Sequence, residues 1–103
     1  FSDKFFFYGF FPEKNKIILE DLKVLSKLDC SIVFFISSKK LNRIIPFIKD
    51  FFSDRDILIC REMTKLYEEY IRIKIKQLEP FQKEFKGELT LVISNKKYKK
   101  KIS

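Results

Sequence analysis

The chain has 103 residues, of which 46% are hydrophobic and 35% charged, and its formal net charge is +8. This composition is typical of a single folded domain and excludes a disordered chain. No apolar run approaches the ~20 residues that a membrane-spanning helix needs. With no His and only two Cys, we expect no metal site of the zinc type.

Taken in chain order, the first predicted element is a strand at Phe5–Tyr8, an aromatic run that ends at Gly9. A helix is predicted over residues 13–29, where apolar residues recur with a helical period. Pro12 precedes it and suits the first turn of a helix, because the N–H that Pro lacks has no partner there.

The next two elements repeat this strand-then-helix order. Residues 31–36 form a continuous apolar run that predicts a buried strand, and residues 39–52 return to helical spacing. Pro46 lies inside that second pattern, where it either kinks the helix or marks a later start.

Four further elements follow. Residues 57–60 predict a short buried strand that contains Cys60, which we expect to be a buried, reduced thiol. Residues 67–75 alternate in part between apolar and charged side chains, which predicts an antiparallel edge strand with one wet face. Residues 77–86 predict a short helix, and residues 89–93 predict the last strand. The order predicts an α/β domain of two or three layers, with helices flanking a mixed sheet.

A dense polar cluster follows the third strand, over residues 61–69. Open α/β sheets commonly place their ligands in the crevice beyond the strand ends. Folding alone needs no such cluster, so we expect it to mark the functional site.

Three segments together resemble one protein family. Residues 7–14 (FYGFFPEK) resemble a Gly-Phe-Leu-Pro-x-Lys segment, residues 61–65 (REMTK) resemble Arg-Glu-Leu-Thr-Lys, and residues 86–92 (KGELTLV) resemble a strand that begins Lys-Gly-Glu. They occur in this order and at similar spacing in the ribosomal RNA small-subunit methyltransferase I family, which belongs to the tetrapyrrole-methylase-like enzymes. The resemblance covers essentially the whole chain.

The chain also departs from the pattern of that family. Where the family has Tyr-Glu-Ser-Pro-His-Arg-Leu, residues 35–41 read FISSKKL. Ile36 stands in place of the acid, and Lys39 and Lys40 stand in place of His and Arg. Positive charge is retained, whereas the carboxylate and the imidazole are not.

The resemblance implies an enzyme of two α/β domains with S-adenosylmethionine in the cleft between them. The chain resembles the C-terminal domain, with a mostly antiparallel five-stranded sheet over residues 1–94 and a basic tail over residues 95–103. The Gly-rich cofactor loops of the first domain are not among its motifs, since only Gly9 and Gly87 are present. We therefore expect no activity from this part alone. The chain begins without Met, which is expected for a piece of a longer protein.

The reaction implied is methyl transfer to the 2′-hydroxyl of a cytidine ribose in 16S ribosomal RNA. The expected partners are ribosomal RNA in the small subunit, the N-terminal domain of the same protein and a second copy in a homodimer. We expect a cytoplasmic location, without a membrane. The general base is not identifiable from the sequence.

The resemblance also assigns candidate residues. Those expected at the cofactor are Ile36, Ser37, Arg61, Glu62, Met63, Gly87 and Glu88. Those expected at RNA are Lys14, Lys39, Lys40, Arg43 and Lys65. An ion pair of Arg61 and Glu62 that caps the sheet is an equal alternative, and Lys65 on a solvated loop is another. Gly87 is explained most simply by a turn.

Two other functions remain open at this point. One is a tetrapyrrole methylase with the same fold, and the other is a non-catalytic RNA-binding or interaction module. The basic tail supports the second, since its five Lys supply five of the eight net positive charges. The aromatic residues of 5–11 either stack on RNA bases or, more in keeping with 13 Phe in the chain, form core and interface.

Overall fold

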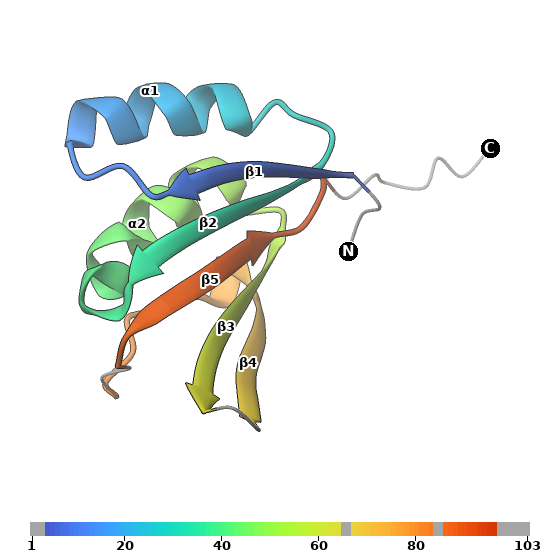
Figure 1. Ribbon diagram of the computed structural model, residues 1–103. Coiled ribbons are helices and arrows are strands. Elements are labelled where there is room, and N and C mark those ends of the chain that lie inside the picture. Colours follow the sequence, from blue (N-terminus) through green and yellow to red (C-terminus); the bar gives the residue numbers. More distant parts are fainter. Residues whose placement is uncertain (1–3, 65–66, 84–85, 97–103) are drawn as a thin grey trace.

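The computed structural model describes residues 4–64, 67–83 and 86–96, and of these only the backbone for residues 62–64 and 67–69. Its strands form one sheet, and its two helices lie between the first three strands in the chain (Figure 1). The strands are β1 (Phe5–Phe10), β2 (Ser31–Ser37), β3 (Asp56–Thr64), β4 (Tyr67–Lys74) and β5 (Glu88–Ile93). The helices are α1 (Asn15–Leu25) and α2 (Leu41–Phe52), with single 3-10 turns η1 (Ser38–Lys40) and η2 (Ile75–Gln77).

The sheet is mixed, as predicted, with strand order β1-β2-β5-β3-β4. β1 and β2 pair in parallel, whereas β5 pairs antiparallel with both β2 and β3. β4 pairs antiparallel with β3 at the edge, which confirms the predicted edge strand. It follows that the carboxyl ends of β1, β2 and β3 reach the same end of the sheet, beside the start of β5.

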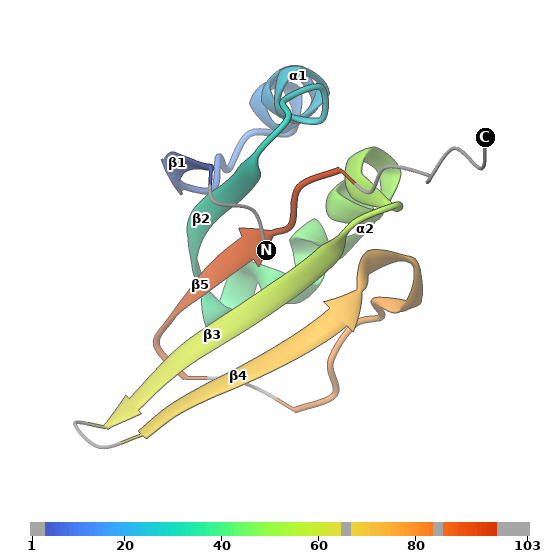
Figure 2. The ribbon, with the colours of Figure 1, turned by 90° about the vertical axis from the view of Figure 1, so that its right-hand side faces the viewer.

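Both helices pack on one face of the sheet, so the domain has two layers (Figure 2). α1 directs Ile18, Leu22 and Leu25 to the core, a spacing that follows the helical period. In β2, Ile32, Phe34 and Ile36 alternate onto the same core. α2 completes it with Leu41, Ile44, Ile45, Ile48 and Phe52.

The predicted helices are longer than the observed ones. α1 ends at Leu25, not at residue 29, because the chain beyond it turns its carbonyls toward the guanidinium of Arg55. Residues 38–40 form a 3-10 turn before α2. Pro46 lies inside α2, which begins five residues before it, so the alternative of a later start is wrong.

The predicted helix over residues 77–86 is wrong. Leu78 has extended backbone angles and a fully buried side chain, so the chain leaves η2 as an extended segment. The side-chain amide of Asn42 on α2 donates to the carbonyl of Phe81 and accepts from its N–H, both at 2.8 Å. The side chain of Asn42 therefore satisfies the backbone N–H and C=O of Phe81, which a local helix would otherwise pair.

The two cysteines are free and half-buried. The prediction that Cys60 is fully buried is therefore wrong. In β3, Ile57 and Ile59 face the helices, so Cys60, which follows Ile59, belongs to the opposite face, and none of the described helices covers that face. Across the described ranges, no helix is both long enough and apolar enough to cross a membrane.

Candidate functional site

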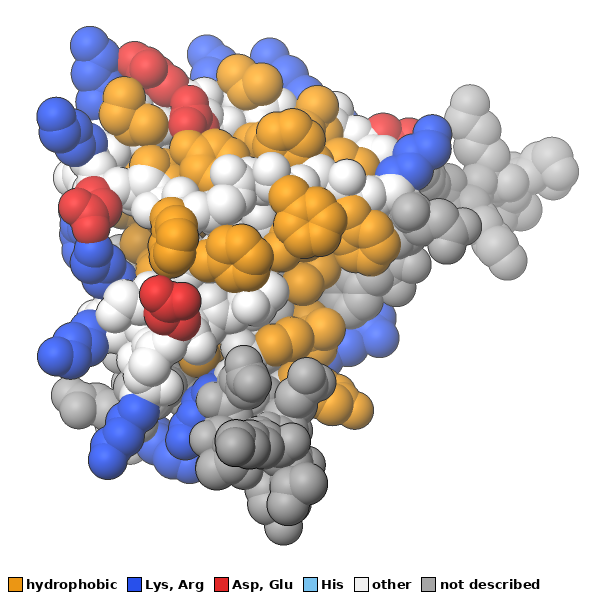
Figure 3. All heavy atoms as spheres, viewed as in Figure 1, with side chains coloured by type: hydrophobic (Ala, Val, Ile, Leu, Met, Phe, Trp, Pro, Cys, Tyr) orange, Lys and Arg blue, Asp and Glu red, His pale blue; other side chains and the backbone are white. Residues whose placement is uncertain are grey.

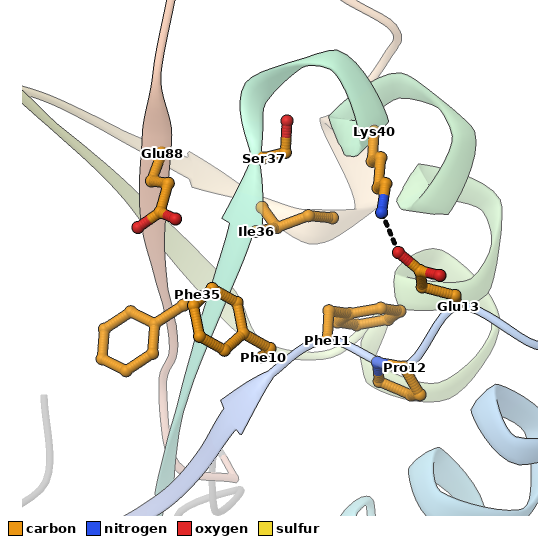
Figure 4. A pocket seen from close by; sticks show the side chains of 9 residues that line it. All are labelled: Phe10, Phe11, Pro12, Glu13, Phe35, Ile36, Ser37, Lys40 and Glu88. Carbon is orange, nitrogen blue, oxygen red and sulfur yellow. Dashed lines mark hydrogen bonds and ion pairs between the residues drawn. The ribbon is translucent and has the colours of Figure 1, made fainter.

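A pocket of about 370 Å³ opens where β1 and β2 end and β5 begins (Figure 4). This is the crevice beyond the strand ends in which α/β sheets commonly bind ligands. Nine residues line it: Phe10, Phe11, Pro12, Glu13, Phe35, Ile36, Ser37, Lys40 and Glu88.

A β-bulge in β1 builds the aromatic side of the pocket. Phe7 pairs with Val33, but the next residue in register is Gly9, which adopts φ +97°. Glycine adopts this conformation without the steric cost that a Cβ imposes. The extra residue is Tyr8, whose ring packs on the helix side of the sheet, 5.1 Å from Phe34.

Beyond the bulge, successive residues point to opposite faces again. Phe10 lies against Phe35 with 5.9 Å between ring centroids, edge to face. Phe11 is buried on the helix side, 5.0 Å from Phe34. The bulge thus lets Phe10 and Phe11 contribute to two sides of the same pocket.

Tyr8 also fixes α1 to the sheet. Its hydroxyl donates a hydrogen bond to the carboxylate of Asp21 on that helix. Burial, and then the hydrogen bond and negative charge of Asp21, raise the pKa of Tyr8 to about 12. The phenol is therefore neutral at physiological pH and acts as a donor.

One wall of the pocket carries an ion pair between Lys40 and Glu13 (Figure 4). The hydrogen bond and the charge of Lys40 lower the pKa of Glu13. Arg43 donates to the backbone oxygen of Glu13 at 2.9 Å and to Oδ1 of Asn15 at 3.1 Å. These contacts join the connection that follows β1 to the start of α2.

Glu88 forms the opposite wall and comes from β5 (Figure 4). Its position is fixed by the end of β2, because Glu88 pairs with Ser37, and the carbonyl of the preceding residue, Gly87, accepts a hydrogen bond from the N–H of Ser38 at 2.9 Å. Gly87 has φ +83°, which confirms the predicted turn role. The pocket therefore has aromatic rings, one hydroxyl and one carboxylate on the side away from the ion pair.

The structure brings together part of the predicted cofactor set. Ile36, Ser37 and Glu88 line the pocket, and Gly87 adjoins it. Arg61 lies on the same row of the sheet, since Leu89 pairs with Ile36 on one side and with Arg61 on the other. Arg61 therefore belongs to the same end of the sheet but does not line the pocket.

The sequence predicted that the polar cluster of residues 61–69 follows the end of the third strand, and this prediction is wrong. β3 continues to Thr64 and β4 begins at Tyr67, with pairing as far as Thr64 and Tyr67 across the hairpin. Glu62 and Met63 are strand residues of which only the backbone is described, and Lys65 lies outside the described residues. β3 extends into this polar segment because pairing with β4 satisfies the backbone N–H and C=O groups whatever the side chains are.

The predicted RNA-binding residues divide into two groups. Lys14 and Lys39 are exposed, whereas Lys40 and Arg43 contact the segment that contains Glu13. The sequence assigned Lys40 to RNA and did not predict five other residues that line the pocket: Phe10, Phe11, Pro12, Glu13 and Phe35. The position of residues 10–13, just after the first predicted strand, was the available signal for four of them.

Comparison with known proteins places the chain in a family. Over 98 residues, the chain is 41% identical to the ribosomal RNA small subunit methyltransferase I of Thermotoga maritima, and the match covers 92% of the chain. The proteins of the same name from Bacillus subtilis and Rickettsia prowazekii are each 34% identical, over 86% and 90% of the chain. The chain is a homologue of part of the ribosomal RNA small subunit methyltransferase I family. This confirms the resemblance drawn from the three segments.

The chain spans less than half of these methyltransferase I relatives: 43% of the Thermotoga protein, 31% of the Bacillus protein and 34% of the Rickettsia protein. No protein-family model matches it. Among solved structures, the methyltransferase CobJ superposes with a TM-score of 0.62 at 13% identity, over 88% of this chain and 41% of that chain. That likeness confirms the predicted fold class.

Proposed function

We propose that the chain forms one wall of the S-adenosylmethionine site of an RNA ribose methyltransferase. The observation that carries this proposal is the pocket, because Ile36, Ser37 and Glu88 from the predicted cofactor set line it together. Relatives named ribosomal RNA small subunit methyltransferase I support the choice of an RNA substrate.

The residues present suit part of the cofactor. Phe10 and Phe35 offer apolar ring surface of the kind on which a planar base packs. Ser37 and Glu88 offer hydrogen-bonding groups for amino and hydroxyl groups of an adenosine. The volume, about 370 Å³, is near the lower end of small-molecule pockets, as expected if another domain supplies the rest of the site.

When bound, the cofactor supplies an electrophilic methyl group for direct displacement by a hydroxyl. The proposed role of this chain is to bind and orient, since methyl transfer depends on close alignment of the reacting atoms. The ion pair of Lys40 and Glu13 holds the connection after β1 in place and thereby keeps Phe10 and Phe11 in the pocket wall.

The finer assignments rest on the family. We infer that residues 1–94 are the C-terminal domain and residues 95–103 a basic tail, and that this part alone is inactive. The substrate is the 2′-hydroxyl of a 16S ribosomal RNA cytidine, in a cytoplasmic enzyme that pairs as a homodimer. Lys14 and Lys39, both exposed, are the described residues best placed for RNA phosphates.

Binding and turnover test the proposal separately. We expect the polypeptide encoded by the complete gene to bind S-adenosylmethionine in a calorimetric titration, and Glu88→Gln to weaken that binding about tenfold, the loss of about one charged hydrogen bond. Glu20→Gln, on the exposed face of α1, is the matched control. If Glu88→Gln and Glu20→Gln bind S-adenosylmethionine with equal affinity, Glu88 does not contact the cofactor.

Turnover is measured on small ribosomal subunits from a strain that lacks the methylation. We expect transfer of labelled methyl to 16S ribosomal RNA and resistance of one cytidine ribose to alkaline cleavage. Methylation of a tetrapyrrole but not of the subunit supports the tetrapyrrole alternative. Tight RNA binding without cofactor binding supports the non-catalytic module.

A further inference from the structure

One side of the pocket lies on the face of the sheet that none of the described helices covers, here called the open face. Phe35 precedes Ile36 of the core and therefore points to the open face. Glu88 precedes Leu89 of the core and does the same, and Phe10 pairs with Phe35. Figure 3 shows hydrophobic side chains gathered over β1 and β2 on this face, with acidic side chains at the border of the group.

The carboxylate of Glu88 lies beside these aromatic rings. Glu88 pairs with Ser37, two residues beyond Phe35 on β2, so Glu88 and Phe35 are diagonal neighbours on the open face. Diagonal neighbours lie about 7–8 Å apart, within reach of aromatic and long side chains. Phe10 extends the aromatic surface and is 66% exposed, so its ring is accessible. A carboxylate and two rings therefore border the same side of the pocket (Figure 4).

Glu88 gives the pocket a negative charge that no other lining residue balances. Three of the nine lining residues are charged, and two of them, Lys40 and Glu13, form an ion pair and neutralise each other. Within the part of the chain that the structure describes, no cation pairs with the carboxylate of Glu88. Arg61 points to the opposite face, because it pairs with Leu89 of the core.

We propose that Glu88, Phe10 and Phe35 recognise the positive charge of a sulfonium group, and thereby select S-adenosylmethionine over the product S-adenosylhomocysteine, whose sulfur is uncharged. The inference rests on the cofactor site proposed above. The face of an aromatic ring attracts a cation, as in the aromatic cages that bind quaternary ammonium groups. A carboxylate beside the rings adds a direct charge attraction. A sulfonium resembles a quaternary ammonium because it has no N–H to donate, so it depends on these two attractions.

The same groups would favour release of the product. In methyl transfer, the ribose oxygen forms a bond to the methyl carbon, and the hydroxyl proton passes to solvent. The bond between sulfur and the methyl carbon breaks, and its electron pair stays on sulfur. The sulfur thereby loses its positive charge, so its attraction to the carboxylate and the rings ends in the same step. The amino and carboxylate groups of the two ligands are identical, and the ratio of their affinities therefore measures this attraction.

Calorimetric titration of the polypeptide encoded by the complete gene tests the inference. We expect S-adenosylmethionine to bind about tenfold more tightly than S-adenosylhomocysteine, which corresponds to about 1.4 kcal/mol. Sinefungin, in which a carbon that bears a protonated amine replaces the methylated sulfur, should bind nearly as tightly as S-adenosylmethionine.

Two variants locate the attraction. Glu88→Gln keeps the shape of the side chain and removes its charge. It should weaken S-adenosylmethionine about tenfold but S-adenosylhomocysteine only about threefold, so that the ratio falls to about threefold. Phe10→Leu should also lower the ratio, because it removes one ring. Glu20→Gln, on the exposed face of α1, is the matched control and should keep the tenfold ratio.

The outcomes separate this inference from the proposed function. Equal affinity for the two ligands overturns the inference and leaves the cofactor site standing. An unchanged ratio in Glu88→Gln also overturns it, since Glu88 would then act on both ligands alike, for example as an acceptor for a ribose hydroxyl. If neither ligand binds, the cofactor site falls and the inference with it. Glu88 is exposed and its variant has the same shape, so the result does not depend on whether Phe10→Leu folds.

Discussion

The side chain of Arg55 stabilises the end of the domain opposite the pocket, and its replacement gives the sharpest test of the fold. Arg55 is 2% exposed, and its guanidinium donates to four backbone oxygens. The distances are 2.8 Å to Ser26, 3.3 Å to Leu28 and to Ser94, and 3.4 Å to Cys30. One cation therefore joins the end of α1, the start of β2 and the end of β5.

The expected cost of Arg55→Met follows from these contacts. The 2.8 Å bond to Ser26 contributes about 1.5 kcal/mol as a charged hydrogen bond, and the three longer ones together about 1 kcal/mol. The guanidinium also lies 5.0 Å from the centre of the Phe52 ring, which adds about 0.5 kcal/mol. Burial lowers the pKa of Arg55, an effect that the charges of Asp54 and Asp29 oppose, but arginine stays protonated in proteins. The loss amounts to about 3 kcal/mol.

Urea unfolding followed by circular dichroism measures this loss. A loss of 3 kcal/mol lowers the melting temperature by about 15 °C in a domain of this size. Arg72→Met is the matched control, because Arg72 is 61% exposed and its 3.2 Å ion pair with Asp56 contributes only about 0.5 kcal/mol. Arg55→Lys retains the charge but not the planar fork and should fall between the two. If Arg55→Met costs no more than Arg72→Met, the four carbonyl contacts do not stabilise the domain.

Three further predictions concern other contacts. Burial and Asp21 raise the pKa of Tyr8 to about 12, so the neutral phenol adds stability that is complete below pH 10 and is lost as pH rises toward 12. Tyr8→Phe should reduce the dependence of the unfolding free energy on pH over that window, and an unchanged slope contradicts the assignment. Gly87→Ala places a Cβ at φ +83° and should cost about 1 to 2 kcal/mol in urea unfolding, although open space surrounds that atom; a neutral effect would mean that the turn relaxes. Asn42→Ala removes both hydrogen bonds to Phe81 and should cost about 1 kcal/mol and speed proteolysis of the segment after η2, with cleavage elsewhere counting against this account.

Periodicity predicted most of the elements because their patterns are local. The apolar spacing in α1 and α2 and the continuous apolar run of β2 placed these elements within a few residues of their observed ends. The failure was the helix over residues 77–86. There, the hydrogen bonds to Phe81 come from Asn42, 39 residues earlier in the chain, and no local pattern carries that information.

The candidate site divides in the same way. Ser37, Gly87 and Glu88 were predicted at the cofactor because each belongs to a segment that resembles the family, and Ser37 and Glu88 line the pocket together. Glu13 and Lys40 are 27 positions apart and form their ion pair only when β1 and β2 lie in parallel. That contact could be predicted only from the order of the strands in the sheet, which no local sequence pattern indicates.

The sequence by itself determined that this is a single α/β domain, which segments resemble the methyltransferase I family and where most strands and helices lie. It determined these because side-chain periodicity and short motifs are properties of neighbouring residues. Only the tertiary structure decided that β3 and β4 pair as far as Thr64 and Tyr67, where the sequence predicted a strand exit, and that the pocket lies at β1, β2 and β5. Among the described residues, it also placed both helices on one face of the sheet and none on the other. Strand pairing joins residues that are distant along the chain, and the backbone hydrogen bonds that hold it are the same for every residue type except proline.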